Sequence, residues 1–551
     1  MSKRLLGICL IVALVAPTVP ALLVHMPPLQ DYPDHFARLW LIAGGAELEP
    51  VSGMYAVDWT AAWTNVGIDL AAVALTPLMP VETLAPLLLA AAVALPPLGA
   101  VALNRVVFGA WHPWQIGFAF FGFATTLLAG NLNFQIGLGL ALLAAATDPW
   151  ASRRLGPLGA ILWRVALAVA LLRVHLFAVA FYAVLVAALA LGPRFGELVP
   201  GSAGAVSKFG RALAAGLAVT VPVLVFYALA SAVPGAHLED PASGAPAWAG
   251  WRWRLTNLLT PVRAYHRVDY LLAAALAVPL VAALVFGRLR VHAGLLLATA
   301  GLGALALVSP SSVGGTLGVE TRFPIMAALT LAAALRPEYA RLPYAGRRAE
   351  AAVAAGLLAL VLVRTAWIGG IWQARSHTDT AAVERALAHV PAGAAVLPLS
   401  HLPTPADAGA APVGRYGMLG PAYASLPTLA VPLRRAYGIL FAARGKQPLR
   451  VLPPWDDIHA HDTTLVSMHA LLGPAEALPA NATYVRLWRD RFDYALVLNA
   501  DVPDAAGPLP PVQGLELLAD EGFARLYQIH RRPGPGARIS GAEVASGRPP
   551  P

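Results

Sequence analysis

The sequence HMPPLQDYPDHFAR, which runs from His25 to Arg38, constrains this protein more than any other stretch. It places two aspartates, two histidines and an arginine beside three prolines, directly after the first long apolar run. Charged groups at the end of a membrane helix are costly unless they reach the interface or have a function. We therefore interpret this loop as the chemical centre and the apolar segments around it as its scaffold.

The composition is typical of a polytopic membrane protein. Of the 551 residues, 58% are hydrophobic and 13% are charged, whereas soluble domains carry about 25% charged residues. The net charge of +9 does not indicate nucleic-acid binding, because most Lys and Arg residues lie at helix ends. Cys9 is the single cysteine, which excludes a disulfide within the chain. The Ala-, Arg- and Pro-rich usage suggests a bacterial protein.

The first apolar segment, Leu5–Val24, has about 20 residues and follows Ser2-Lys3-Arg4. We interpret it as an uncleaved membrane helix rather than a signal peptide, because the run is long and many apolar segments follow. The positive-inside rule then places the N-terminus in the cytoplasm and His25–Arg38 outside. Further membrane helices are expected at 83–104, 113–129, 133–147, 158–172, 174–192, 211–231, 268–287, 291–309, 322–336 and 350–371.

The segment Val66–Pro80 decides the number of spans. It has about 15 apolar residues and contains Asp69, whereas a span needs about 20. If it does not span, the Arg-rich connections between Arg105 and Arg348 fall in the cytoplasm; if it spans, the positive-inside rule fails at nearly every loop. We therefore predict 11 spans, with 12 as the alternative. Residues 25–82 then form one external stretch with interfacial helices, such as the aromatic and polar segment Ser52–Asn65.

The composition changes after Trp372, where ordinary polar residues replace the apolar segments. Thr380–His389 has the pattern of an amphipathic helix, and strands are predicted at 394–399, 493–499 and 523–530. This order suggests a small α/β domain. We divide the chain into a membrane domain (1–372), an extracytoplasmic α/β domain (373–531) and a disordered tail (532–551).

Three residues of the first loop are candidates for chemistry. Asp31 lies before the expected helix, where a carboxylate could take a proton from a hydroxyl group or bind a divalent cation such as Mg²⁺ or Mn²⁺. Asp34 is either a second catalytic carboxylate or the N-cap of a helix that starts near Pro33. His35 is a metal ligand, a phosphate contact or a surface residue at the helix start.

The same topology gathers four other polar places on the outer side: 130–133, 173–175, 232–267 and 309–322. Arg suits a phosphate, because its planar fork donates two hydrogen bonds. Arg322 is either such a contact or the partner of Glu320 in an ion pair. Arg173 and His175 are either site contacts or the tip of a hairpin that reaches the headgroups.

With these features the chain resembles the GT-C superfamily of membrane glycosyltransferases, in particular the polyprenyl-phosphate-sugar-dependent mannosyl- and aminoarabinosyltransferases. The resemblance rests on a first helix with its N-terminus inside, the acidic motif Asp31-Tyr32-Pro33-Asp34-His35 directly after it, interfacial helices in the first external loop and an external C-terminal domain. It covers about residues 1–370. It differs from the family pattern because the second acidic residue is not adjacent to the first.

The resemblance implies a sugar donor linked to polyprenyl phosphate, an acceptor that is a lipid, a glycan or a protein, and transfer at the outer face of the bacterial cytoplasmic membrane. By position, Asp31 would be the base or the metal-associated carboxylate, with Asp34 or His35 assisting. Which carboxylate acts as the base, and whether a metal is used, stays open. The leaving phosphate needs cations, for which we predict Arg322, then Arg173 and His175, and after them Arg263 and His266.

The alternative function is that of a non-catalytic transporter or assembly factor for lipid-linked glycans of the cell envelope. Ion-coupled transporters usually carry polar or broken helices at mid-membrane. Here the polar residues gather at one face, which favours chemistry at the interface. The sequence also has no GxxxxGK[ST] loop and no HExxH motif, so neither an ATP-driven pump nor a zinc protease is indicated.

Overall fold

The fold was analysed in a computed structural model of the chain. It describes residues 2–198, 204–231, 247–313, 316–339, 346–401, 411–440, 447–459, 465–473, 480–502 and 511–530, together with 478 and 509. The predicted disordered tail and residues 232–246 of the long Trp- and Arg-rich loop lie outside this part.

The first apolar segment forms two helices, α1 (Lys3–Val15) and α2 (Thr18–Leu23), rather than the single helix expected over Leu5–Val24. Pro17 stands at the N-cap of α2. Proline lacks a backbone N–H and cannot continue a helical hydrogen-bond ladder. The Thr18 hydroxyl donates to the carbonyl of Val15 at 2.7 Å and so bridges the break.

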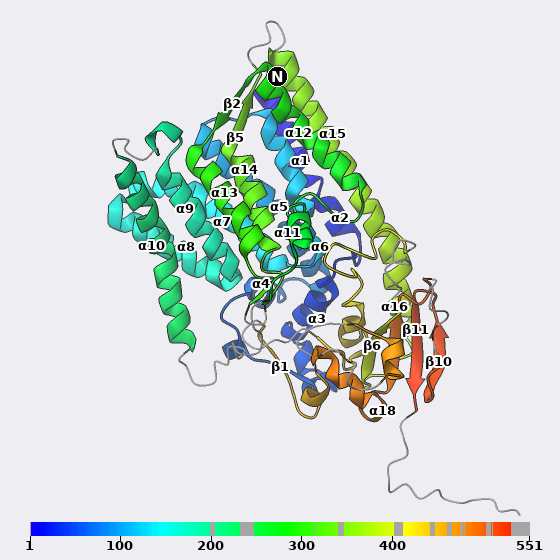
Figure 1. The fold of residues 1–551 in the computed structure, drawn as a ribbon. Coiled ribbons are helices and arrows are strands. Elements are labelled where there is room, and N and C mark those ends of the chain that lie inside the picture. The colour runs from blue at the N-terminus through cyan, green and yellow to red at the C-terminus, as the bar shows by residue number, and fades with distance from the viewer. Residues whose placement is uncertain are drawn as a thin grey trace, which may run out of the picture.

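Most of the other expected membrane helices are present (Figure 1). They are α5 (Val81–Phe108), α7 (Leu132–Arg154), α8 (Gly156–Val174), α9 (Leu176–Leu191), α10 (Ala205–Ser231), α12 (Val268–Phe286), α13 (Ala293–Val308), α14 (Arg322–Ala334) and α15 (Gly346–Arg375). The helix expected at 113–129 is instead the 3₁₀-helix η4 (Pro113–Phe123) followed by the short helix α6 (Thr125–Leu128). Among the described residues, five helices are long and apolar enough to span a membrane. The count of 11 spans therefore stays a prediction.

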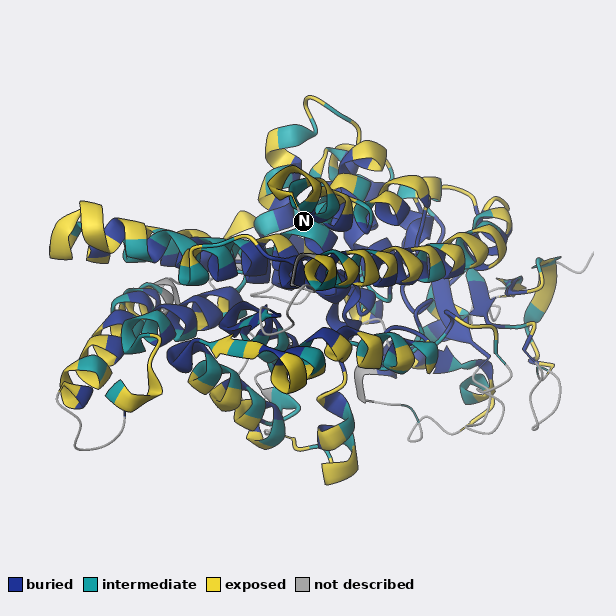
Figure 2. Ribbon diagram, turned by 90° about the horizontal axis from the view of Figure 1, so that it is seen from above, coloured by how far each residue is buried: buried dark blue, intermediate teal, exposed yellow. Residues whose placement is uncertain are grey.

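The outer faces of these helices are apolar and exposed, whereas their inner faces are buried (Figure 2). Leu213 and Leu224 on α10 are 64% exposed, and Val285 on α12 is 65% exposed. Large exposed apolar surfaces of this kind mark contact with lipid or with another protein. The helical part is thus built to lie in a bilayer.

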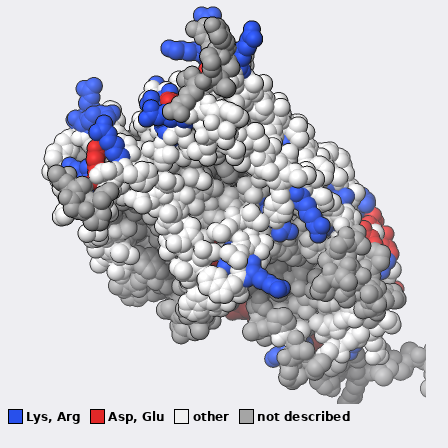
Figure 3. Space-filling model, turned by 45° about the horizontal axis from the view of Figure 1, so that its top comes forward, with Lys and Arg blue, Asp and Glu red and all other residues white. Residues whose placement is uncertain are grey.

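One end of the bundle collects the basic connections. Strand β2 (Arg288–Val291) pairs antiparallel with β5 (Leu335–Glu338), and the backbone N–H of Ala293 donates to the carbonyl of Pro193 at 3.1 Å. The N-terminus and this β2–β5 ladder lie together at the top of Figure 1. Figure 3, in which the top comes forward, shows Lys and Arg side chains gathered there. The side of the membrane that this end faces stays a prediction.

The stretch 25–82, which is predicted to be external, contains α3 (Tyr32–Ile42) and α4 (Gly67–Leu75). Because α4 has nine residues, it is too short to span, since a span takes about 20. The expected interfacial helix over Ser52–Asn65 is wrong. This segment holds the short strand β1 (Tyr55–Val57), which pairs antiparallel with β7 (Leu449–Val451). Its partner lies almost 400 residues away in the sequence, so local pattern alone does not reveal the strand.

The C-terminal part contains a mixed sheet with the strand order β10-β11-β9-β6-β8. Its strands are β6 (Val396–Ser400), β8 (Val466–Ser467), β9 (Tyr494–Leu498), β10 (Leu515–Asp520) and β11 (Ala524–Ile529). Strand β6 runs parallel to β8 and β9, whereas β11 runs antiparallel to β9 and β10. Helix α16 (Ala381–Leu387) packs on β11. The three predicted strands and the amphipathic helix are confirmed.

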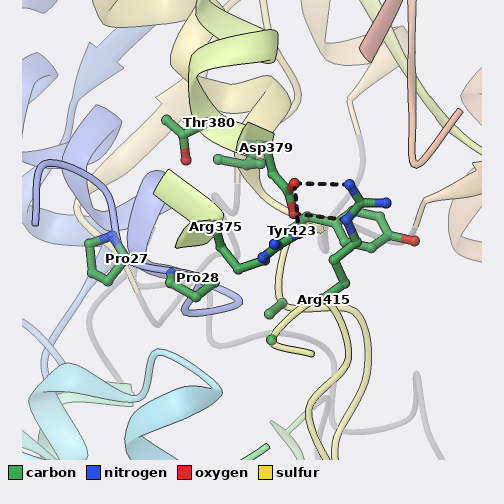
Figure 4. Close-up of a pocket in the computed structure, with 10 residues that line it drawn as sticks. Pro27, Pro28, Arg375, Asp379, Thr380, Arg415 and Tyr423 are labelled. Carbon is green, nitrogen blue, oxygen red and sulfur yellow. Dashed lines mark hydrogen bonds and ion pairs between the residues drawn. The ribbon is translucent and has the colours of Figure 1, made fainter. Parts of the chain in front are cut away.

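A buried ion network joins the end of α15 to this sheet, beside the first loop (Figure 4). The guanidinium of Arg415 donates to both carboxylate oxygens of Asp379, at 2.9 and 3.0 Å, and to both of Asp501, at 2.6 and 2.8 Å. Pro27 and Pro28 line the same small pocket. The network therefore fixes the sheet against the chain that leads to Asp31.

Candidate functional site

Asp31 lies at the turn before α3, in close contact with the backbone of Gly130. Gly130 has a φ of +85°, a left-handed conformation that glycine adopts without strain. A Cβ at this position would come within 2.6 Å of the Asp31 nitrogen and 2.7 Å of its Cβ. The turn between α6 and α7 thus approaches Asp31 as closely as backbone allows, and it holds the carboxylate in place.

His35 anchors α3 to the same turn. Its Nε2 donates to the carbonyl of Gly130 at 2.8 Å, and the ring is buried. Burial, followed by the nearby charge of Arg38, lowers the pKa of His35 to about 3. The imidazole is therefore neutral at physiological pH, with Nε2 occupied as a donor. This geometry makes His35 a residue that positions Asp31.

Asp34 is buried in the first turn of α3 and faces the C-terminal part. It lies within electrostatic reach of Tyr55, whose hydroxyl contacts the backbone of Gly438. The interpretation of Asp34 as an N-cap is wrong by three residues. Helix α3 begins at Tyr32 with Asp31 in the N-cap position and Pro33 in the first turn, where a missing N–H is tolerated.

Arg322, the first residue of α14, lies within electrostatic reach of two carboxylates, first that of Glu320 and then that of Asp31. Its Nη1 donates to the carbonyls of Leu317 and Gly318 at 2.8 and 2.7 Å. The alternative, a direct ion pair with Glu320, is not formed among these contacts: Oε1 of Glu320 accepts from the Trp253 indole at 2.9 Å, although its charge still acts on Arg322. Arg322 therefore keeps donors for another anion.

His175 lies beside Arg322 at the junction of α8 and α9. Its Nδ1 accepts the backbone N–H of Phe177 at 3.1 Å and so caps α9. The ring of Phe177 lies under the Arg322 guanidinium, 5.1 Å from Cζ to the centroid. Arg173 turns the other way, and its Nη1 donates to the carbonyl of Trp63 at 3.2 Å. His175 thus joins the cluster, and Arg173 ties α8 to the first loop.

The two remaining candidates, Arg263 and His266, make different contacts. The carbonyl of Arg263 accepts from the Thr125 hydroxyl at 2.8 Å, next to the turn that touches Asp31. His266 is exposed, and its ring packs at 6.1 Å against Trp367 on α15. The backbone of Arg263 therefore lies beside the turn that touches Asp31, whereas the ring of His266 packs on α15.

A buried ion pair between Arg38 and Asp69 escaped the sequence interpretation. The Arg38 Nε donates to Asp69 Oδ1 at 2.8 Å, and their side chains are 1% and 0% exposed. Neither Nη1 nor Nη2 of Arg38 has a hydrogen-bond partner among the described residues. The available signal was Asp69 itself, a lone charge in an apolar segment, which needs a partner when it is buried.

The described residues near Asp31 do not form a set of ligands for the expected metal ion. Within the described residues, no three His, Cys, Asp or Glu side chains are grouped so that they could hold a metal. His35, the nearest imidazole, uses Nε2 on Gly130. A divalent cation therefore stays a prediction from sequence, and no step below runs through one.

The fold and this cluster define a class of protein: a polytopic membrane protein with an acidic first loop at one end of a helical bundle and a mixed sheet packed beside it. Among solved structures, the chain matches ArnT from Cupriavidus metallidurans bound to undecaprenyl phosphate, at 14% identity and a TM-score of 0.50. The match covers 96% of this chain and 98% of that chain. The apo structure of the same ArnT matches at 13% identity, with the same TM-score and coverage.

No protein-family model matches the sequence, and no curated protein sequence matches it. The likeness to ArnT therefore establishes the fold. It confirms the predicted fold, a polytopic helical membrane part with a C-terminal α/β part, as one of the ArnT type.

Proposed function

We propose that this protein is a membrane glycosyltransferase that moves a sugar from a polyprenyl-phosphate donor to a lipid, glycan or protein acceptor. The observation that carries the proposal is that Asp31 and the buried Arg322 guanidinium lie within electrostatic reach of each other, at one end of a bundle with the ArnT fold. One of the two matching ArnT structures holds undecaprenyl phosphate, which supports a polyprenyl-phosphate-linked donor.

The reaction needs opposite charges on its two sides. Cleaving the bond between the anomeric carbon and the phosphate develops positive charge on the sugar and negative charge on the phosphate. In our proposal Asp31 takes the proton of the acceptor as the acceptor attacks the anomeric carbon. The bond to phosphate then breaks, and polyprenyl phosphate leaves with the electron pair.

Arg322 and His175 are the proposed contacts of the leaving phosphate. The Arg322 Nε is buried without a hydrogen-bond partner among the described residues, and a guanidinium donates two parallel hydrogen bonds to a phosphate. His175 offers Nε2, because its Nδ1 is engaged by the Phe177 backbone. Arg263 is a further cation at the border of this site, while Asp34 and His35 position α3.

The decisive experiment is transfer from a radiolabelled polyprenyl-phosphate sugar by purified protein in liposomes. Asp31→Asn should abolish transfer while leaving the protein folded. Glu47→Gln is the matched control, because it removes an exposed carboxylate from the same stretch, 25–82. Full transfer by Asp31→Asn would exclude Asp31 as the base. No transfer by wild type from several donors would move the assignment to the transporter or assembly function.

We further propose that the protein lies in the bacterial cytoplasmic membrane, with its N-terminus inside and the C-terminal sheet outside. The single cysteine, Cys9, makes this easy to test in a Cys9→Ser background. A cysteine introduced at exposed Glu516 should react with an impermeant maleimide in intact spheroplasts, whereas one at Arg153 should react only after lysis. The reverse pattern would invert the orientation.

A further inference from the structure

A second polar cavity lies at the other end of the helical bundle, far from Asp31. It has a volume of about 430 Å³ and lies between α7, α8, α9 and α10. Its polar lining comes from Asp148, Ser152, Arg164 and Arg211. Pockets for small molecules are commonly about 300–1,000 Å³, so the cavity is large enough for a head group.

The distance of this cavity from Asp31 along α7 places it at the level of the opposite leaflet of a bilayer. Helix α7 begins at Leu132, beside the turn that touches Asp31, and Asp148 lies about 24 Å farther along it at about 1.5 Å per residue. The hydrocarbon core of a bilayer is about 30 Å thick. The cavity therefore lies close to the far boundary between hydrocarbon and head groups.

Two tryptophans mark the same level. Trp150 and Trp163 pack edge to face with ring centroids 5.9 Å apart, and the Trp163 indole donates to the Thr147 hydroxyl at 2.9 Å. Trp150 is 48% exposed. Tryptophan is enriched at membrane–water interfaces, where one side of the ring is apolar and the other meets polar groups. Independently of helix length, these rings indicate the headgroup level.

The charges in the cavity leave room for an anion. Arg164 pairs with Asp148 through Nε at 2.7 Å and Nη2 at 3.1 Å, which neutralises that carboxylate. Its Nη1 donates to no partner among the described residues, and neither does the exposed guanidinium of Arg211. The lining thus carries one positive charge more than negative.

The rest of the lining is apolar and continues onto the lipid-facing surface. It comprises Ile161 on α8, Leu189 and Ala190 on α9, and Ala214 and Ala215 on α10. A water-soluble anion would gain no binding free energy from these apolar side chains. A lipid would lay its acyl chains along it, with its phosphate at the two arginines.

We propose that this cavity binds one anionic phospholipid, whose phosphodiester contacts Arg211 and Nη1 of Arg164 and whose acyl chains lie against α9 and α10. A phosphodiester brings one negative charge, which balances the excess charge of the lining. Arg donates to phosphate in a bidentate way. The site is separate from the proposed transfer site, since it lies in the opposite leaflet.

The test is native mass spectrometry of the full-length, delipidated protein with phosphatidylglycerol or phosphatidylcholine of identical acyl chains. Wild type should retain one phosphatidylglycerol in preference to phosphatidylcholine. Arg211→Gln should weaken that retention about tenfold, since a hydrogen bond to a charged group contributes about 1.5–3 kcal/mol. Arg153→Gln is the matched control, because this exposed arginine lies at the same end outside the cavity.

Asp148→Asn should change the retention of phosphatidylglycerol in the opposite direction to Arg211→Gln. Removing the carboxylate frees Arg164 for the phosphate, so phosphatidylglycerol should bind more tightly than in wild type. A merely destabilised protein would lose lipid instead. Asp31→Asn should retain the lipid as wild type does, which separates this site from the proposed activity.

Three results would overturn the proposal. The first is equal retention of the two phospholipids by wild type. The second is an equal loss in Arg211→Gln and Arg153→Gln, which would indicate surface charge alone. The third is displacement of phosphatidylglycerol by stoichiometric undecaprenyl phosphate in an Arg211-dependent way, which would make a prenyl phosphate the occupant.

Discussion

Arg38 donates from Nε to Oδ1 of Asp69 at 2.8 Å, with both side chains completely enclosed between α3 and α4. This contact fixes the helix that carries the acidic motif onto the only other helix of the external stretch that is longer than one turn. It also explains why Asp69 is present in an apolar segment. The position of Asp31 thus depends on a buried pair farther along the same helix.

Breaking this pair should destabilise the protein strongly. Asp69→Ala leaves the Arg38 charge buried without its partner, which typically costs about 3–5 kcal/mol. SDS-induced unfolding in mixed micelles measures the loss. The double variant Arg38→Met/Asp69→Leu should recover most of it, because two apolar side chains need no partner. A cost below about 1 kcal/mol for Asp69→Ala would contradict the buried geometry.

Gly130→Ala should reduce stability and, under the proposed function, abolish transfer. The added Cβ would lie 2.6 Å from the Asp31 nitrogen, so the backbone that carries the carboxylate must shift. Gly109→Ala is the control, because Gly109 also has a positive φ, of +66°, but no atom lies within 4 Å of an added Cβ. It should lose about 1–2 kcal/mol of stability from backbone strain alone. The transfer rate and the melting temperature are measured for both variants. Equal losses in Gly130→Ala and Gly109→Ala would show that the close contact between Gly130 and Asp31 does not matter.

His35 should make the protein sensitive to acid. Its pKa is about 3 in the folded protein and about 6.5 when unfolded, so the unfolded chain binds more protons between these values. The stability from neutral His35 is therefore complete above about pH 6.5 and is lost progressively as the pH falls toward 3. Melting temperatures from pH 8 to pH 4 should fall less steeply for His35→Gln than for wild type. Parallel curves would show that His35 is not buried as a neutral ring.

Under the proposed function, Arg322→Gln should lower the rate of transfer by at least about 100-fold, because the leaving phosphate would lose its charged donor. Arg322→Lys should restore part of the rate, since it keeps the charge but loses the fork geometry. Arg252→Gln removes an exposed arginine from the neighbouring loop and should transfer normally. A normal rate in Arg322→Gln would show that Arg322 does not stabilise the leaving phosphate.

Arg415→Ala should loosen the C-terminal sheet. Buried Asp379 would lose both of its hydrogen bonds to Arg415 and keep only the longer contact with Arg375, at 3.3 Å, as an ion pair, which is costly for an ionised group. Hydrogen exchange should quicken in β6 and β9. Arg385→Ala, which breaks an exposed pair with Glu521, should change little, because exposed pairs contribute about 0–1 kcal/mol. Equal exchange in the two variants would show that the Arg415 network does not hold the sheet.

The sequence by itself determined the helical bundle and three strands of the sheet. An apolar segment long enough to cross a bilayer folds as a helix, since every backbone polar group must be paired inside the segment. Val396–Ser400 and Tyr494–Leu498 were predictable because short apolar runs bounded by turn residues favour buried strands. Asp31 was predicted to be functional because a charge at the end of a membrane helix is costly unless it has a function.

Only the tertiary structure decided which candidates lie together. Asp31 and Arg322 are nearly 300 residues apart in the sequence, and Arg38 pairs with Asp69 through the packing of two helices. Likewise, Tyr55–Val57 is a strand because a strand from the C-terminal part pairs with it. Long-range contacts of this kind leave no local period in a sequence, because each partner is chosen by the fold as a whole.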